Sequence, residues 1–231
     1  MVVRVAERAA WSAAGRVVVA TDDQRIADAC TQAGVSVAMT RSDHATGTDR
    51  LSEVVTQLGL PDDAVVVNVQ GDEPLIPASV INQVASLLQQ RANAAMATFC
   101  HPIHEVADAI NPNVVKCALN QASEAMYFSR APIPYARDDW SAGINAMPSS
   151  LPMYRHIGLY AYRASFLRIF PTLAIPAIER FEALEQLRAL AHGYRIAVAV
   201  VDAPLPPGID TPEDYARLRE RYSASGESFF T

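Results

Sequence analysis

VVVNVQGDEPLIP, residues 65–77, decides the fold, because an unbroken apolar run ends there in a glycine, two acidic residues and a proline. Valine-rich runs bounded by turn residues are typical of strands buried on both faces of a parallel sheet. Gly71 lets the backbone turn, and Pro74 stops the strand. Ligands of α/β proteins collect outside the carboxyl ends of strands, so Asp72 is a candidate Mg²⁺ ligand beside a phosphate. An ordinary turn acid explains the same residues equally well.

The first hundred residues alternate strands and helices in the way of a largely parallel α/β sheet. Strands are predicted at 16–21, 35–40, 64–70 and 94–103. The first helix is expected to be capped within TDD (21–23) and to run through Ala33, where Gly34 ends it; the next two are expected from a cap at Thr48 and from Pro77 or Ala78. Leu51, Val54, Val55 and Leu58 form one apolar stripe of the second helix.

After residue 104 the pattern changes to antiparallel strands at 111–119 and 123–130, a long loop at 137–152, and an alternating strand at 155–163. A single helix is predicted from Pro176 to His192, with Phe181, Leu184 and Leu187 facing inward. Glu182, Glu185 and Gln186 would then share another face. A last strand at 195–201 and a helix opened by Thr211 follow.

Composition restricts the class of protein. The chain has 231 residues, is 50% hydrophobic and carries a net charge of −6, which argues against a surface built for nucleic acid or anionic membrane. Its three cysteines are widely spaced and lack zinc-site partners. We find neither a signal peptide nor an apolar run long enough to span a bilayer, so a soluble cytoplasmic protein without a membrane or nucleic-acid partner is expected.

Further polar segments could complete a site at the strand ends. Asp210 precedes a helix cap and could be a second metal ligand or only a capping aid. In the segment 40–50, small residues free backbone groups for a ligand, and Arg41 and Arg50 could contact a base or phosphate, although a capped loop with solvated arginines fits as well. A mixed donor and acceptor face, suited to a polyhydroxylated acid or to a polar dimer surface, includes Lys116, Arg130, His156, Tyr160, Glu182, Glu185 and Gln186.

In their order, these segments resemble one family, the 3-deoxy-manno-octulosonate (KDO) cytidylyltransferases, also called CMP-KDO synthetases. The resemblance extends from residue 1 to about 220. It rests on VATDDQRIADA, MTRSDHATGTDRLSEV, VNVQGDEPLIP, NPNVVKCAL, YFSRAPIP, RHIGLYAYR, LEQLRAL and GIDTPEDYARL.

The resemblance implies a Rossmann-like nucleotidyltransferase fold and transfer of CMP from CTP to KDO. Pyrophosphate leaves, and the product CMP-KDO supplies KDO for lipopolysaccharide synthesis. The resemblance also implies a Mg²⁺-dependent homodimer. Asp72 and Asp210 would hold the metal and, with Lys116, form the catalytic group. The cytidine would be surrounded by Arg41, Gly47, Thr48, Arg50 and Gln70, and the sugar acid by Arg130, His156, Tyr160, Glu182, Glu185 and Gln186.

The resemblance also divides the single domain, residues 1–231. Residues 1–103 would form the nucleotide and metal half, 104–202 the sugar-acid and dimer subregion, and 203–222 the return to the metal site, followed by a tail at 223–231. A CMP-sugar synthetase for another 2-keto sugar acid is the alternative enzyme.

This chain differs from the family at its N-terminus. The family opens with a strand and a loop of glycine, arginine and lysine around the triphosphate, whereas residues 1–4 here already fall in the first helix. Three readings stay open: a start upstream of Met1, a truncated copy of low activity, or a non-catalytic dimerising or ligand-binding relic.

Overall fold

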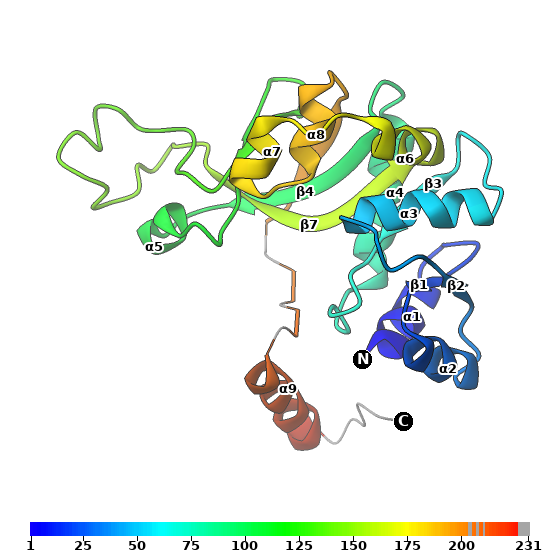
Figure 1. The fold of residues 1–231 in the computed structure, drawn as a ribbon. Coiled ribbons are helices and arrows are strands. Elements are labelled where there is room, and N and C mark those ends of the chain that lie inside the picture. The colour runs from blue at the N-terminus through cyan, green and yellow to red at the C-terminus, as the bar shows by residue number, and fades with distance from the viewer. Residues whose placement is uncertain (203–204, 207, 210, 226–231) are drawn as a thin grey trace.

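The main sheet has six strands in a computed structural model that describes residues 1–202, 205, 206, 208, 209 and 211–225 (Figure 1). The order is β6–β5–β7–β4–β8, with β3 beside β7. Because β7 is antiparallel to β3 and β4, and β8 is parallel to β4, the strands β3, β4 and β8 point the same way. The predicted α/β class with a mixed sheet is confirmed, although four of the five strand pairings in the described main sheet are antiparallel. The bounds are β3 (Val65–Asn68), β4 (Met96–Pro102), β5 (Lys116–Leu119), β6 (Ala125–Ser129), β7 (Tyr154–Arg163) and β8 (Ile196–Val200).

Helices cover both faces of this sheet. On one face α3 (Gly47–Gln57), α6 (Ala164–Ile169) and α8 (Gln186–Ala191) pack over a core that includes Tyr160 and Tyr162. On the other face α4 (Ala78–Gln90) packs over a core that includes Leu159 and Ala161. The alternation predicted for residues 155–163 is therefore real, and each face of β7 supplies a hydrophobic core.

The N-terminal segment forms a smaller unit beside the main sheet. Strands β1 (Val19–Thr21) and β2 (Val37–Met39) pair in parallel, and α1 (Val2–Ala10) and α2 (Gln24–Gln32) pack on them (Figure 1). Helix α2 begins at its cap Asp23 and ends before Gly34, whose φ of +71° suits glycine, as the sequence predicts.

A cavity of about 1230 Å³ lies between the two sheets. It is lined by β1, β3 and the apolar sides of α1, α3 and α4. The prediction that the valine strand is buried on both faces is wrong here, because every residue of β3 is only half-buried. No described strand pairs with the β3 edge that faces away from β7.

Two helix predictions need correction. Residues 176–192 do not form one helix: α7 (Ala177–Glu182) and α8 are separated at Ala183, which has a φ of +51°. This break turns Phe181 outward, where it is 91% exposed, while Leu184 and Leu187 stay buried. Helix α3 is capped by Thr46, which accepts from the N–H of Asp49, and Thr48 lies buried in the first turn.

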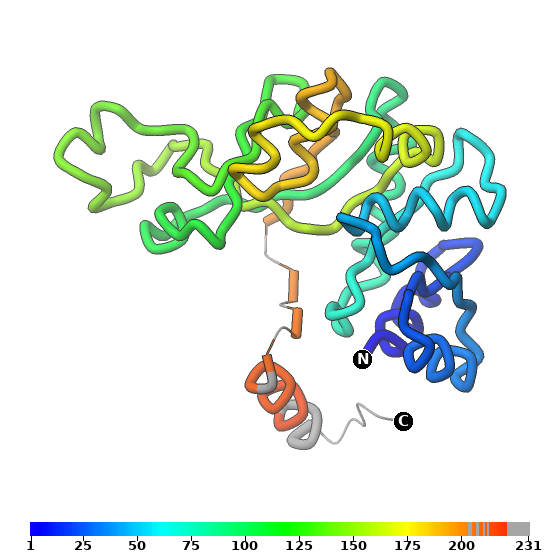
Figure 2. The backbone as a smooth tube through the Cα atoms, viewed as in Figure 1, coloured from blue at the N-terminus to red at the C-terminus, as the bar shows by residue number. Residues whose placement is uncertain are grey.

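The predicted long loop at 137–152 holds no helix or strand and extends away from the sheet (Figure 2). Its buried Trp140 packs with Ile103, Val114 and Met153, which ties the loop to the body. The remaining elements are α5 (Val106–Ile110), a 3₁₀ turn (Phe170–Thr172) and α9 (Pro212–Ser225). Within the described ranges, no helix is long and apolar enough to cross a membrane.

Candidate active site

The end of β3 and the segment before α9 meet at Asp72. The N–H of Ile209 donates to the carbonyl oxygen of Asp72 at 2.8 Å. Gly208 packs so closely that a Cβ on it would lie 3.3 Å from this oxygen and 3.9 Å from the carboxyl carbon of Asp72. Asp210, the second predicted metal ligand, lies outside the described residues.

Glu73 adds a second carboxyl group at this place. Its Oε2 is buried and has no hydrogen-bond partner among the described residues. Burial, and then the charge of Asp72, raises the pKa of Glu73 to about 7. Two adjacent carboxyl groups with a free oxygen fit a hard divalent cation, which takes one or two carboxylates together with water and phosphate. Across the described part of the chain, no three His, Cys, Asp or Glu side chains cluster as a complete metal cage.

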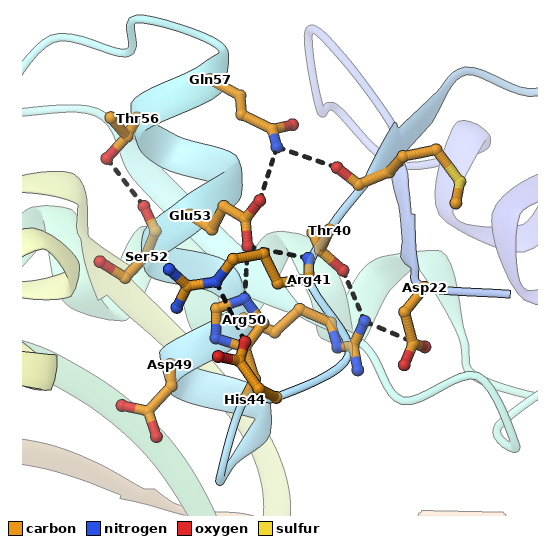
Figure 3. A network of polar contacts seen from close by, with 12 residues as sticks. Asp22, Thr40, Arg41, His44, Asp49, Arg50, Ser52, Glu53, Thr56 and Gln57 are labelled. Carbon is orange, nitrogen blue, oxygen red and sulfur yellow. Dashed lines mark hydrogen bonds and ion pairs between the residues drawn. The ribbon is translucent and has the colours of Figure 1, made fainter.

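The loop from Thr40 to Arg50 is held by ion pairs on both sides (Figure 3). The Arg50 guanidinium donates to Thr40 Oγ1 at 2.5 Å and lies 3.2 Å from Asp22. Arg41 is exposed and pairs with Asp43 at 3.0 Å. Arg50 therefore belongs to the loop's framework, and Arg41 is the more accessible cation.

His44 and Glu53 anchor the same loop to α3. The ring Nε2 of His44 contacts Glu53 Oε2, and the N–H of Arg41 donates to the same oxygen at 3.1 Å (Figure 3). These two hydrogen bonds hold the pKa of Glu53 below its usual value. His44 thus ties the loop to α3.

Thr48 links this loop to the other half of the predicted site. Its hydroxyl donates to Glu185 Oε1 at 2.8 Å and lies 3.2 Å from the hydroxyl of Tyr162. Glu185 precedes α8, so the contact joins residues that are far apart in the sequence. The second oxygen of Glu185 is buried and unpartnered in the described structure.

An aromatic row runs along β7. Ring centroids are 5.0 Å apart between Phe128 and His156, 5.2 Å between His156 and Tyr160, and 5.7 Å between Tyr160 and Tyr162. Burial lowers the pKa of His156 to about 3, so its imidazole is neutral, with Nε2 3.2 Å from Thr98 Oγ1. Burial, and then Tyr162 and Glu185, raises the pKa of Tyr160 well above its usual value.

Three predicted sugar-binding residues carry buried polar atoms without partners among the described residues: Tyr160 Oη, Glu185 Oε2 and Gln186 Nε2. An unmade hydrogen bond at a buried group costs about 1–3 kcal/mol. Such groups in a native protein call for an explanation, and a bound polar molecule is one. Together they offer a hydroxyl, a carboxylate acceptor and an amide donor.

Arg130 and Glu182 are hydrogen-bonded to each other. Glu182 accepts from Ser129 Oγ at 2.6 Å and from the N–H of Arg130 at 2.8 Å, and Arg130 Nε donates to the carbonyl of Glu182 at 2.6 Å. Lys116 lies beneath them, fully buried, and its ammonium donates to the carbonyls of Asn111, Val114 and Arg130. Burial lowers the pKa of Lys116, and all three of its donors are used.

The cavity between the sheets brings together four predicted residues, namely Gly47, Arg50, Gln70 and Glu185. Gln70 lies against β7, where a Cβ on Gly158 would be 3.4 Å from its Nε2. Arg41, Lys116, Arg130 and His156 do not line this cavity.

The sequence did not indicate the buried ion cluster beside Glu185. Arg188 is 2% exposed and binds Glu179 through Nε at 2.9 Å and Nη2 at 2.5 Å. Its Nη1 lies 3.5 Å from Asp49 Oδ1, and its guanidinium carbon lies 4.3 Å from the ring centroid of Phe170. An arginine inside LEQLRAL, on an otherwise apolar helix face, was the available signal.

A strand-end carboxylate pair, a neighbouring helix-start loop and a doubly covered sheet define a nucleotide-binding α/β protein. The model of the cytidylyltransferase family matches residues 1–196, and the chain belongs to this family. At 36% identity and a TM-score of 0.85, it resembles the structure of CMP:2-keto-3-deoxy-manno-octonic acid synthetase complexed with CTP, covering 96% of this chain and 87% of that one.

Two more distant structures share the fold alone. One is a cytidylyltransferase from Leptospira borgpetersenii serovar Hardjo-bovis, at 15% identity and a TM-score of 0.58, over 96% of this chain and 75% of that one. The other is 4-diphosphocytidyl-2C-methyl-D-erythritol synthase, at 14% identity and a TM-score of 0.57, over 95% and 86%.

Proposed function

We propose that this chain is a KDO cytidylyltransferase, which transfers the CMP group of CTP to the anomeric hydroxyl of KDO and releases pyrophosphate. The observation that carries the proposal is the double role of Glu185. One of its oxygens accepts from Thr48 of the helix-start loop, and the other is buried and unpartnered beside Tyr160. A nucleotide at the loop and a polyhydroxylated acid at Glu185 would therefore be neighbours. The similarity to a CTP-bound synthetase of CMP-KDO supports this choice of substrates.

On the sugar-acid side, Tyr160, Glu185 and Gln186 would bind hydroxyl groups of KDO, since each has an unused polar atom. His156 would act as a neutral hydrogen-bonding group, because its depressed pKa leaves it uncharged at pH 7. Arg130 and Glu182 would shape the pocket wall, since their mutual hydrogen bonds fix the end of β6 against α7. Lys116 is proposed as a positioning residue and not as a catalytic one, because its ammonium faces only backbone carbonyls.

On the nucleotide side, Gly47, Arg50 and Gln70 line the cavity and would surround CTP together with the accessible Arg41. Thr48 would act indirectly, by orienting Glu185. Asp72 and Asp210, with Glu73 adjacent, would hold a divalent cation, proposed as Mg²⁺, which when bound neutralises phosphate charge. Catalysis would consist of orienting the two substrates and excluding water, without a covalent intermediate. We further propose a cytoplasmic homodimer that serves lipopolysaccharide synthesis, with the domain halves assigned above.

The test is pyrophosphate release by the purified chain with CTP, Mg²⁺ and KDO, with omission of each in turn. We expect release that requires all three, and a CMP-sugar product identified by mass spectrometry. Other 2-keto sugar acids in place of KDO test specificity, and a faster rate with one of them would reassign the substrate. Absence of turnover, together with absence of CTP and KDO binding by calorimetry, would overturn the proposal.

A further inference from the structure

The start of α3 and the start of α8 are joined by two side-chain contacts. Thr48 donates to Glu185 at 2.8 Å, and Asp49 lies 3.5 Å from Arg188. Thr48 and Asp49 are consecutive residues, and Glu185 and Arg188 are one helical turn apart. The two contacts therefore form a short double bridge between the loop proposed for the nucleotide and the residues proposed for the sugar acid.

The Arg188 end of this bridge is rigid. Its guanidinium is fixed by two hydrogen bonds to Glu179 and by the face of the Phe170 ring. Both Arg188 and Glu179 are buried, with exposed fractions of 2% and 7%. Glu179 raises the pKa of Arg188 further, so the guanidinium stays charged. Bidentate geometry in a buried place leaves Arg188 little freedom to follow a moving partner.

The Asp49 end controls the conformation of the loop. Asp49 Oδ2 accepts from Thr46 Oγ1 at 2.9 Å, and the N–H of Asp49 donates back to the same hydroxyl at 3.2 Å. Thr46 is the cap of α3 and directly precedes Gly47, which lines the cavity. The carboxylate of Asp49 therefore contacts the loop cap with one oxygen and Arg188 with the other.

We infer that Arg188 and Asp49 are positioning residues that couple the binding of nucleotide and sugar acid. The inference rests on the proposed function. A nucleotide that orders the cap Thr46 and Gly47 fixes Asp49 and Thr48, and these in turn fix Glu185 through Thr48 and the first turn of α8 through Arg188. Whichever ligand binds first restricts residues that the second must otherwise order, so each raises the affinity for the other by the same factor.

A buried ion cluster that only stabilises the fold predicts a different result. Breaking such a cluster would lower the melting temperature. It would also reduce the affinity for each ligand by the same factor, whether or not the other ligand is bound. The coupling factor is the Kd of one ligand measured without the other ligand, divided by its Kd measured with the other ligand bound. It separates the two cases, because an equal loss of affinity in both measurements cancels in the ratio.

The experiment measures this factor by calorimetry in the full chain, using KDO and a CTP analogue whose α,β-bridging oxygen is replaced by methylene. Wild type is expected to show a coupling factor of about 5–150, the usual range for linked sites. Asp49→Asn, which keeps the shape and removes the charge, is expected to lower the factor at least threefold. Thr48→Val cuts the second contact and is expected to lower it similarly. Arg168→Lys, at a surface pair with Asp62 on the far end of α6, is the matched control and should leave it unchanged.

Each outcome has one meaning. A wild-type coupling factor of one, or an unchanged factor in Asp49→Asn, would overturn the inference while leaving the proposed function intact. Failure of wild type to bind either ligand would overturn the proposed function itself. Asp49→Asn and Thr48→Val each remove one contact and leave the buried pair of Arg188 and Glu179 in place, so both variants are expected to fold.

Discussion

Ile209 donates its backbone N–H to the carbonyl of Asp72, so the segment before α9 returns to the end of the strand that leads into the acidic turn. The contact joins residues more than a hundred positions apart in the sequence. It brings two separate segments of the chain together at Asp72, the carboxylate proposed above to hold a divalent cation.

Asp72→Asn is expected to lower the rate of pyrophosphate release by about a hundredfold or more, because a neutral amide binds a hard cation poorly while keeping the same shape. The measurement is steady-state release with KDO and CTP saturating, together with the melting temperature. Asp63→Asn, at an exposed position just before β3, serves as control. Near-normal rates in Asp72→Asn would remove this carboxylate from the site.

Gly208→Ala is expected to raise the Mg²⁺ concentration needed for half-maximal rate. The added Cβ would lie 3.3 Å from the carbonyl oxygen of Asp72, which must shift to accommodate it. Gly15→Ala is the matched control, since a Cβ there has no neighbour within 4 Å. A metal titration that is identical in both variants would argue against a metal ion at Asp72.

Tyr160→Phe is expected to maintain or raise the melting temperature and to weaken KDO binding. The free protein loses a buried hydroxyl that has no described partner, which removes an unfavourable group, whereas bound KDO loses a hydrogen bond. Tyr162→Phe is the comparison, because its hydroxyl contacts Thr48 and its removal should cost about 1 kcal/mol of stability. Calorimetric Kd values and thermal unfolding of both variants check this. Equal destabilisation by the two changes would argue against an unsatisfied Tyr160.

Acid is expected to destabilise the fold through His156. Its pKa is about 3 in the folded chain and about 6.5 when unfolded. Between these values the unfolded chain binds the extra proton, so the free energy of unfolding falls as the pH drops, by up to several kcal/mol. Glu73, with a folded pKa of about 7, has the opposite effect between its unfolded value near 4.5 and pH 7. The difference between wild type and His156→Gln isolates the histidine.

In His156→Gln, the free energy of unfolding measured in urea should therefore depend less on pH between pH 6.5 and 3 than it does in wild type. His192→Gln, at an exposed position, provides the control and should follow wild type. Parallel curves for wild type and His156→Gln would show that the imidazole is not held neutral.

The elements predicted from the sequence were those with a strong local signal. Helix α2 follows from Asp23 and Gly34, and the order of strands follows from short apolar runs between turn residues. The break at Ala183 could not be predicted, because alanine rarely adopts a left-handed conformation and the helical periodicity continues through it. Tertiary contacts, chiefly those of Glu182 with β6, decide the conformation there.

The features of the candidate site also differ in whether they have a local signal in the sequence. The role of Asp72 stays a prediction that rests on its place at a strand end. The contact between Thr48 and Glu185 could not be predicted, because it joins residues far apart in the sequence. The surroundings of Lys116 could not be predicted either, because the three carbonyls that its ammonium contacts belong to loops whose paths the sequence does not reveal.

The open edge of β3 has a consequence for the chemistry of the cavity. Alternate residues of β3 direct their backbone N–H and C=O groups away from β7, and the whole strand lines the cavity between the two sheets. A polar molecule in the cavity can therefore hydrogen-bond to main-chain groups that no described strand uses, so its contacts there would not depend on the identity of the side chains.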